Sequence, residues 1–174
     1  MSGPEIRTSR LLLRQWRAED VEPFAAICRD PEVMRYIGSG TTRTHEQAVL
    51  SVKAFEREWE ENGYGLFAVE LVGGDQMIGF TGLAIPTFLP EILPTVELGW
   101  RFARSAWGNG YATEAARAVL DFALVQLRLP EVVSIYQADN HASARIVQKL
   151  RMRFDRETVD PTCGRLIEVY RATA

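Results

Sequence analysis

A pair of glycines between an apolar strand and a long apolar helix constrains this fold more than any other feature. Gly108 and Gly110 follow a strand-like run at residues 96–102 and precede a helical pattern that begins near Tyr111. Glycine lets the backbone turn sharply and lets a bulky ligand approach main-chain N–H groups. The first turn of the following helix offers unpaired N–H donors and a positive dipole to an anion. The segment therefore predicts a phosphate or pyrophosphate seat, although an ordinary tight turn fits the same window.

Two common phosphate-binding loops do not match this segment. A P-loop requires a lysine directly after its last glycine, and Tyr111 stands there instead. The dinucleotide fingerprint requires Gly-x-Gly-x-x-Gly/Ala near the start of a parallel sheet. Thr113 occupies its third position, and the segment lies in the middle of the chain. Nucleotide-dependent oxidoreduction is therefore disfavoured, because it would require tight binding of a dinucleotide.

Length and composition indicate one globular domain over residues 1–174. The chain is 47% hydrophobic and 25% charged, which is ordinary for a globular protein. A net charge of −3 argues against nucleic acid as the main partner. No apolar run approaches the roughly 18 residues of a transmembrane helix, and Arg7, Arg10 and Arg14 interrupt any signal-peptide core. We expect no membrane partner.

The cysteines and histidines do not form a metal-binding pattern. Cys28 and Cys163 lack the spacing of metal ligands, and His45 and His141 are isolated. We therefore expect no metal. Reduced cysteines are typical of the cytosol, so we expect a cytoplasmic location.

Periodicity, capping residues and turn residues predict the order of elements. Asp30-Pro31 is typical of a helix start, and Thr44-x-x-Gln47 is a capping box whose helix should end near Gly63. The three prolines at 86, 90 and 94 predict an exposed loop. The expected strands lie near residues 11–13, 65–72, 76–85, 95–103, 132–138, 154–160 and 166–172, and the expected helices near 20–28, from 31, 44–62, 111–127 and 141–150.

This order and five spaced motifs resemble the GNAT N-acetyltransferases, and most closely their RimJ/RimL-like (ribosomal-protein N-acetyltransferase) subgroup. The motifs are residues 8–16, the Asp-Pro-Glu-Val-Met-Arg-Tyr-Ile segment at 30–37, Glu-Leu-Gly-Trp at 97–100, the glycine turn at 107–115, and Asn140-x-x-Ser143. The resemblance covers nearly the whole chain. It implies an α+β, three-layer fold in which helices flank both faces of a mixed, mostly antiparallel sheet.

The sequence departs from the family pattern at two positions. The Arg or Gln that usually stands three residues before the first glycine is Ser105 here, with Arg104 one residue earlier. Backbone N–H donation to a pyrophosphate does not depend on that side chain. The usual Lys-Leu-Gly-Phe after the last helix reads Lys149-Leu150-Arg151-Met152, so arginine replaces the glycine expected at a left-handed helix end.

The resemblance implies acetyl-CoA as the acetyl donor and no metal. The backbone at Phe102 and Ala103 would hold the pantetheine arm like an added strand. Arg145 and Lys149 lie four apart on one helix, where they meet the 3′-phosphate or form a solvated basic face. The candidate cofactor-binding residues are Phe102, Ala103, Arg104, Trp107, Gly108, Asn109, Gly110, Tyr111, Ala112, Thr113, Asn140, Ser143 and Lys149.

The implied reaction is direct attack of an amine on the thioester, without an acyl-enzyme. A backbone N–H of the central strand would face the oxyanion. Ser143 is the candidate that assists the leaving thiolate, or it is a helix-capping serine. Glu97 is the candidate base, directly or through water, or it is a structural glutamate; Glu91 in the proline-rich loop is a weaker rival.

The expected function is transfer of acetyl from acetyl-CoA to an amine in a ternary complex. The acceptor is a protein N-terminal α-amine or a small-molecule amine, because fold does not fix substrate. The alternative is a non-catalytic acyl-CoA-binding or sensing module, which would retain the cofactor and turn over no amine. A homodimer through a sheet edge is compatible with this fold.

Overall fold

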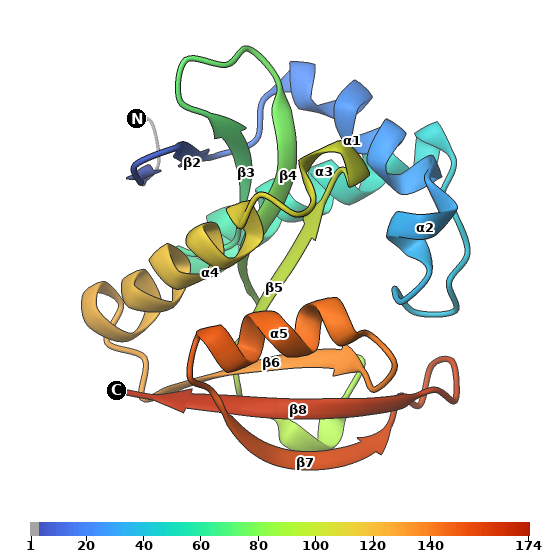
Figure 1. Cartoon of the computed structure of the whole chain (residues 1–174), viewed down its shortest axis with the longest axis vertical. Coiled ribbons are helices and arrows are strands. Elements are labelled where there is room, and N and C mark those ends of the chain that lie inside the picture. Colours follow the sequence, from blue (N-terminus) through green and yellow to red (C-terminus); the bar gives the residue numbers. More distant parts are fainter. Residues whose placement is uncertain (1–3) are drawn as a thin grey trace.

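A single eight-stranded sheet organises the computed structural model, which describes residues 4–174. The strand order is β1-β2-β3-β4-β5-β6-β8-β7, and every neighbouring pair is antiparallel except β5 and β6 (Figure 1). The strands are β1 (Ile6–Arg7), β2 (Leu11–Arg14), β3 (Leu66–Leu71), β4 (Met77–Ala84), β5 (Glu97–Phe102), β6 (Glu131–Gln137), β7 (Arg153–Val159) and β8 (Leu166–Thr173). This arrangement confirms the expected mixed, mostly antiparallel sheet.

The helices begin and end where local capping chemistry dictates. They are α1 (Val21–Arg29), α2 (Pro31–Met34), α3 (His45–Asn62), α4 (Tyr111–Asp121) and α5 (His141–Lys149). Asp30 caps α2 by accepting a hydrogen bond from the Glu32 backbone N–H. Thr44 and Gln47 form the predicted capping box, and Gly63 ends α3 in the left-handed conformation with φ of 73°.

Helices cover both faces of the sheet, as expected. On one face α1 and α3 pack against the aromatic and aliphatic residues of β3 and β4, including Phe80. On the other face α4 packs its alanines and Val119 against Leu98 and Phe102 of β5. Figure 1 shows α4 in front of β3 to β5 and α5 in front of β6. Two apolar layers therefore hold β5 in the middle of the molecule.

β5 and β6 separate soon after they meet, and this separation positions the site. Their parallel pairing is limited to Glu97 opposite Val133. The Val133 N–H donates to the Val96 carbonyl at 2.9 Å, and Ser134 Oγ donates to the Leu98 carbonyl at 3.0 Å. Beyond Leu98, the residues of β5 up to Phe102 have no strand partner on the β6 side within residues 4–174. The sheet therefore opens into a V at its centre.

The structure corrects three local expectations. β1 was not predicted, because two residues carry no periodic signal. The proline-rich segment is not simply an exposed loop, since Leu89 and Ile92 are buried against β6 and β8. The helix predicted over 111–127 is α4 followed by a π-helical turn at Phe122–Gln126.

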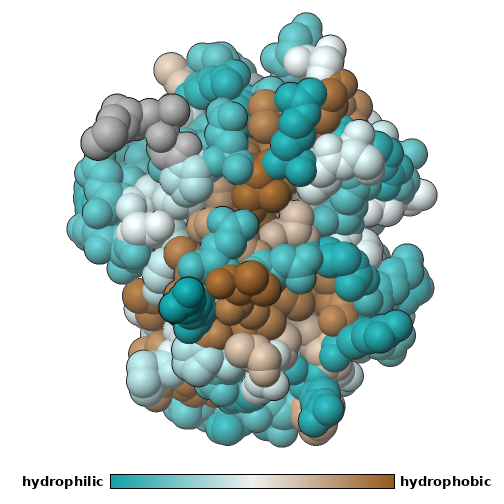
Figure 2. Space-filling model, turned by 90° about the vertical axis from the view of Figure 1, so that its left-hand side faces the viewer, coloured by the Kyte–Doolittle hydropathy of each residue, from teal (hydrophilic) through white to brown (hydrophobic). Residues whose placement is uncertain are grey.

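The surface view shows hydrophobic side chains concentrated along the middle of one face and hydrophilic ones around them (Figure 2). Within residues 4–174, no helix combines the length and the apolarity that crossing a membrane requires.

Candidate active site

A cavity of about 790 Å³ occupies the opening between β5 and β6. Its walls come from β5, β6, the N-terminal turn of α4, the inner side of α5 and the α2 region. The predicted residues that line it are Glu97, Phe102, Trp107, Gly108, Gly110, Tyr111, Ala112, Thr113, Asn140, Ser143 and Lys149. Segments far apart in the sequence therefore contribute to one concave site.

The N-terminus of α4 opens into this cavity without a capping side chain. Its N-cap is Gly110, at φ of 79°, and within residues 4–174 no side chain caps the N–H groups of the first turn. By contrast, Asn140 caps α5 and Thr44 caps α3. The N–H groups of Tyr111, Ala112 and Thr113 are thus the orphan donors of a helix start, placed to bind an anion.

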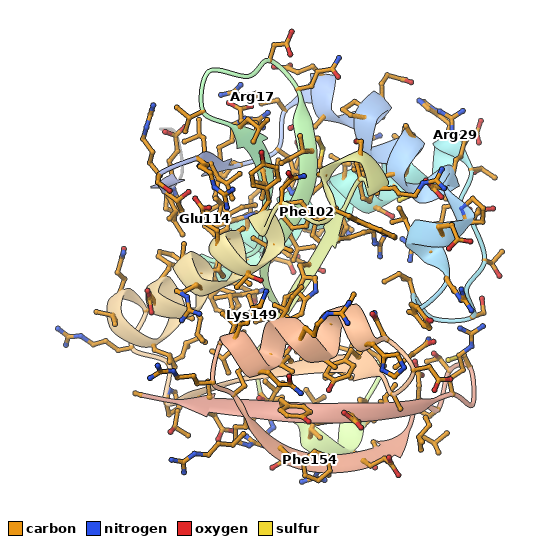
Figure 3. All side chains as sticks on the ribbon, in the orientation of Figure 1. Arg17, Arg29, Phe102, Glu114, Lys149 and Phe154 are labelled. Carbon is orange, nitrogen blue, oxygen red and sulfur yellow. The ribbon has the colours of Figure 1, made fainter. Side chains whose placement is uncertain are left out.

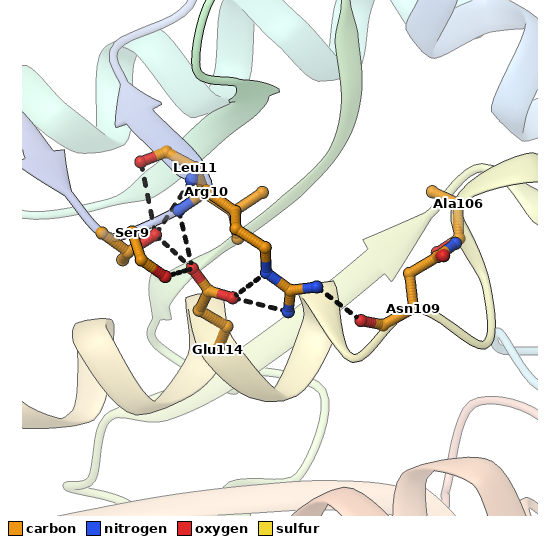
Figure 4. Close-up of polar contacts among 7 residues, drawn as sticks. Ser9, Arg10, Leu11, Ala106, Asn109 and Glu114 are labelled. Carbon is orange, nitrogen blue, oxygen red and sulfur yellow. Dashed lines mark hydrogen bonds and ion pairs between the residues drawn. The ribbon is translucent and has the colours of Figure 1, made fainter.

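A largely solvent-exposed hydrogen-bond network fixes the glycine turn against the start of the chain (Figure 4). Glu114, in the first turn of α4, accepts hydrogen bonds from Thr8 Oγ1 at 2.6 Å and from Arg10 Nε at 2.7 Å. Arg10 Nη1 in turn donates to the Asn109 carbonyl at 3.0 Å. Burial alone would raise the pKa of Glu114, but hydrogen bonds from Thr8, Arg10 and Ser9 outweigh it and lower the pKa. Glu114 therefore stays ionised and holds the loop.

The N-terminus of α5 places Ser143 at the opposite wall. Asn140 Oδ1 accepts from the Ser143 backbone N–H at 3.2 Å, so Asn140 is the helix cap. Ser143 is buried, and its Oγ accepts a hydrogen bond of 3.3 Å from Trp100 Nε1. The alternative interpretation of Ser143 as the helix cap does not describe this geometry, because Asn140 holds that position.

Glu97 lines the same cavity from the start of β5. Burial raises the pKa of its carboxyl group from 4.5 to about 7, and no neighbouring charge or hydrogen bond among the described residues offsets that effect. A carboxyl group with a pKa near neutral pH has the proton affinity that a general base needs. Glu91 instead lies in the short helix Pro90–Ile92, outside the cavity and 3.8 Å from Arg156.

Three predicted cofactor-binding residues lie elsewhere. Arg104 forms an ion pair with Asp30 at 3.0 Å and does not line the cavity. The Asn109 side chain donates to the carbonyls of Ala106 and Trp107, so it supports the turn from within. Ala103 is also absent from the cavity wall. These side chains are therefore not brought together with the others.

The last helix contributes cations to the cavity. Arg145 and Lys149 both line it, one turn apart on α5. Figure 3 shows Lys149 beside the space between α5 and α4. Both cations thus face the side where the α4 N-terminus would hold phosphates.

Other cavity residues carried no recognisable sequence signal. Arg101 and Tyr136 line the cavity, and the Tyr136 hydroxyl donates to Glu168 at 2.6 Å. Gln137 Nε2 donates to the Gly38 carbonyl at 2.7 Å, and Arg165 donates to Gln137 and to the carbonyl of Arg35. These contacts hold the loop after α2 over the cavity. They join residues 28 to 130 positions apart, which only the folded chain reveals.

Comparison with known proteins identifies the family. The acetyltransferase (GNAT) domain model matches residues 10–153. The uncharacterized N-acetyltransferase YnaD of Bacillus subtilis is 32% identical over 148 residues, covering 85% of this chain and 82% of YnaD. An acetyltransferase structure from Agrobacterium tumefaciens superposes with a TM-score of 0.82 at 27% identity, covering 100% of this chain and 96% of that one. The ribosomal-protein α-N-acetyltransferase RimL, solved with coenzyme A, shares only the fold, at 12% identity, a TM-score of 0.79 and 98% coverage of both chains. This chain belongs to the GNAT acetyltransferase family, and its fold is the GNAT fold.

Proposed function

We propose that this chain transfers the acetyl group of acetyl-CoA directly to the nitrogen of an amine in a ternary complex. The observation that carries the proposal is one cavity that joins the uncapped α4 N-terminus, the unpaired edge of β5, Ser143 and Glu97. The α4 N-terminus suits binding of the pyrophosphate, and the unpaired edge of β5 suits binding of the pantetheine arm. Ser143 suits hydrogen bonding to the leaving thiolate, and Glu97 suits proton transfer. The acceptor is a protein N-terminal α-amine or a small-molecule amine.

The proposed chemistry divides among three groups. Glu97 takes a proton from the amine, directly or through water, because only the neutral amine attacks the thioester. A backbone N–H on the unpaired edge of β5 stabilises the oxyanion as the C–N bond forms. Ser143 donates a hydrogen bond to the departing thiolate and keeps its proton, and the sulfur takes up the proton that the attacking nitrogen loses, directly or through solvent. The carbonyl carbon thus gains nitrogen and loses sulfur, and no acyl-enzyme forms.

We also propose the subgroup, the location and the partners of this chain. We place the chain in the RimJ/RimL-like subgroup, as a single domain over residues 1–174 that acts in the cytoplasm. Acetyl-CoA is its donor substrate, and neither nucleic acid nor a membrane is its partner. Support for the location comes from two unpaired cysteines, Cys28 and Cys163. A homodimer would use a sheet edge such as β7, where Phe154 and Val159 are exposed.

An acceptor screen tests the activity. Thiol release from acetyl-CoA is measured with N-terminal peptides, amino acids, polyamines and aminoglycosides, and initial rates are then fitted with both substrates varied. Direct transfer predicts intersecting double-reciprocal lines, whereas an acyl-enzyme predicts parallel ones. Calorimetric binding of acetyl-CoA with no thiol release for any amine would favour the non-catalytic binding module instead.

A further inference from the structure

Arg101 occupies the face of β5 that looks into the cavity beside Glu97. Directly opposite residues of an antiparallel pair point to the same face of the sheet. Arg101 is opposite Phe80, and Glu97 is opposite Ala84. These four residues, together with Gly99 between the two charged ones, line the cavity. Glu97, Gly99 and Arg101 therefore form one continuous wall of the site.

Among residues 4–174, the guanidinium of Arg101 has no anionic partner. Its Nε is buried without a hydrogen bond, and its Nη1 donates only to Cys28 Sγ at 3.4 Å. The group lies over the Phe80 ring, 5.2 Å from the ring centre. Within residues 4–174 it forms no ion pair, whereas the buried Arg14 bonds both Asp20 and Glu70. A cation whose Nε is buried without a hydrogen bond or counter-charge costs stability, so its position indicates a use.

A neighbouring arginine, Arg43, adds positive charge beside Arg101. Burial lowers the pKa of the Arg101 guanidinium, the Cys28 side chain opposes this effect, and the nearby charge of Arg43 lowers the pKa further. Arg43 itself donates to the neutral hydroxyl of Ser51. A negative group bound at Arg101 would therefore offset an electrostatic cost that the folded protein already carries.

The wall also leaves room for a small molecule between its two ends. A Cβ atom at Gly99 would meet nothing within 4 Å, and Ala84 is the small residue opposite Glu97. Four residues along a strand span about 13 Å between Cα atoms. A compound of amino-acid size thus fits between the Glu97 carboxyl group and the Arg101 guanidinium.

We propose that Arg101 binds a carboxylate of the acceptor, so that the substrate is a small-molecule amine that also carries a carboxylate. The planar guanidinium presents paired N–H donors that match a carboxylate. This inference rests on the proposed function, because it identifies the acceptor of that reaction. A small molecule is favoured over a protein N-terminus, since amine and anion must share a cavity of about 790 Å³ with the acetyl end of the cofactor.

The test compares each carboxylate with its uncharged counterpart. Thiol release is measured with the standard L-amino acids, with their α-amides, and with N-terminal peptides as acceptors. Separately, calorimetry measures binding of the N-acetyl-amino acids and their amides to the protein saturated with CoA. Both assays are run on wild type, on Arg101→Gln, on Arg101→Lys, and on Arg29→Gln, which removes an exposed arginine at the end of α1.

The proposal expects at least one carboxylate to be preferred over its amide by roughly tenfold to a hundredfold, the range of a charged hydrogen bond. Arg101→Gln should abolish that preference by raising KM for the acid, while KM for acetyl-CoA and all constants for the amide stay unchanged. Arg101→Lys should restore part of the preference, and Arg29→Gln should keep all of it.

Equal binding of acids and amides by wild type, or an equal loss for both in Arg101→Gln, would overturn the assignment. Selective turnover of peptides would overturn it too. If no amine is acetylated but the calorimetric preference for N-acetyl-carboxylates remains and needs Arg101, the proposed function fails while the anion site stands. If Arg101→Gln does not fold, the acid–amide comparison on wild type and Arg101→Lys decides.

Discussion

Trp100 on β5 and Ser143 on α5 are joined across the cavity by a hydrogen bond of 3.3 Å from the indole Nε1 to the serine Oγ. A hydroxyl group accepts through its lone pairs and donates through one hydrogen. Because the Trp100 N–H already occupies the acceptor side, the Ser143 hydrogen is free to turn toward the cavity. This geometry suits donation to a departing thiolate.

We therefore expect Ser143→Ala to lower kcat by roughly 10- to 100-fold, because water substitutes only in part for the lost donor. KM for acetyl-CoA should change little. Steady-state kinetics with the best acceptor measures both constants. Trp100→Phe is the matched control, since it removes the indole N–H but keeps the serine hydroxyl, and its loss in kcat should be smaller. An unchanged kcat together with a lower Tm would make Ser143 purely structural.

Glu97→Gln should remove the acid limb of the pH–rate profile. Burial raises the pKa of Glu97 to about 7, so the carboxylate that accepts the proton forms only as the pH rises through that value. In wild type, kcat/KM should therefore climb through neutral pH, and in Glu97→Gln it should be low and lack that limb. Acceptors whose amines have different pKa values separate this limb from ionisation of the amine itself.

The raised pKa of Glu97 also predicts how the free energy of unfolding depends on pH. Wild-type stability should fall as the pH rises, whereas wild-type activity should climb. A carboxyl group whose pKa is raised on folding binds an extra proton in the folded state between its unfolded and folded pKa values. Its contribution is favourable below about pH 4.5 and is lost as the pH rises through about 7. Denaturant unfolding should show wild type losing roughly 1–3 kcal/mol relative to Glu97→Gln between about pH 5 and 8.5. A constant difference would contradict the raised pKa.

Gly110→Val should weaken acetyl-CoA binding by about tenfold or more, measured by calorimetry. Gly110 adopts φ of 79°, a conformation that a β-branched residue tolerates poorly, so the turn must shift away from the α4 N-terminus. Gly73 has the same φ at the tip of the β3–β4 hairpin, where a Cβ meets nothing within 4 Å. Gly73→Val should lower Tm similarly yet bind acetyl-CoA as wild type does. Equal affinities in both variants would argue against the glycine turn as the phosphate seat.

Helix boundaries that depend on neighbouring residues could be predicted from the sequence. Charge pairing between segments far apart in the sequence could not. The capping residues Asp30 and Thr44 and the left-handed Gly63 act within a few positions, so the pattern alone located their helices. The missing counter-charge of Arg101 depends instead on what the folded chain places around it. Arg104 shows the same limit, because its ion pair with Asp30 links segments that no local pattern relates.

Arg151→Gly should stabilise the protein by about 1 kcal/mol. Arg151 follows Leu150, the C-cap of α5, and adopts φ of 58°, so the left-handed turn typical of glycine persists with an arginine in place. A non-glycine residue in that region costs on the order of 1–2 kcal/mol, and glycine regains part of this despite its greater entropy when unfolded. Arg153→Gly is the control, because Arg153 is an exposed residue of β7, where glycine should destabilise by roughly 0.5–1 kcal/mol. Thermal and denaturant unfolding should thus give shifts of opposite sign, with kcat unchanged in both variants. A destabilised Arg151→Gly would mean that the arginine side chain stabilises the folded protein by more than its strained backbone destabilises it.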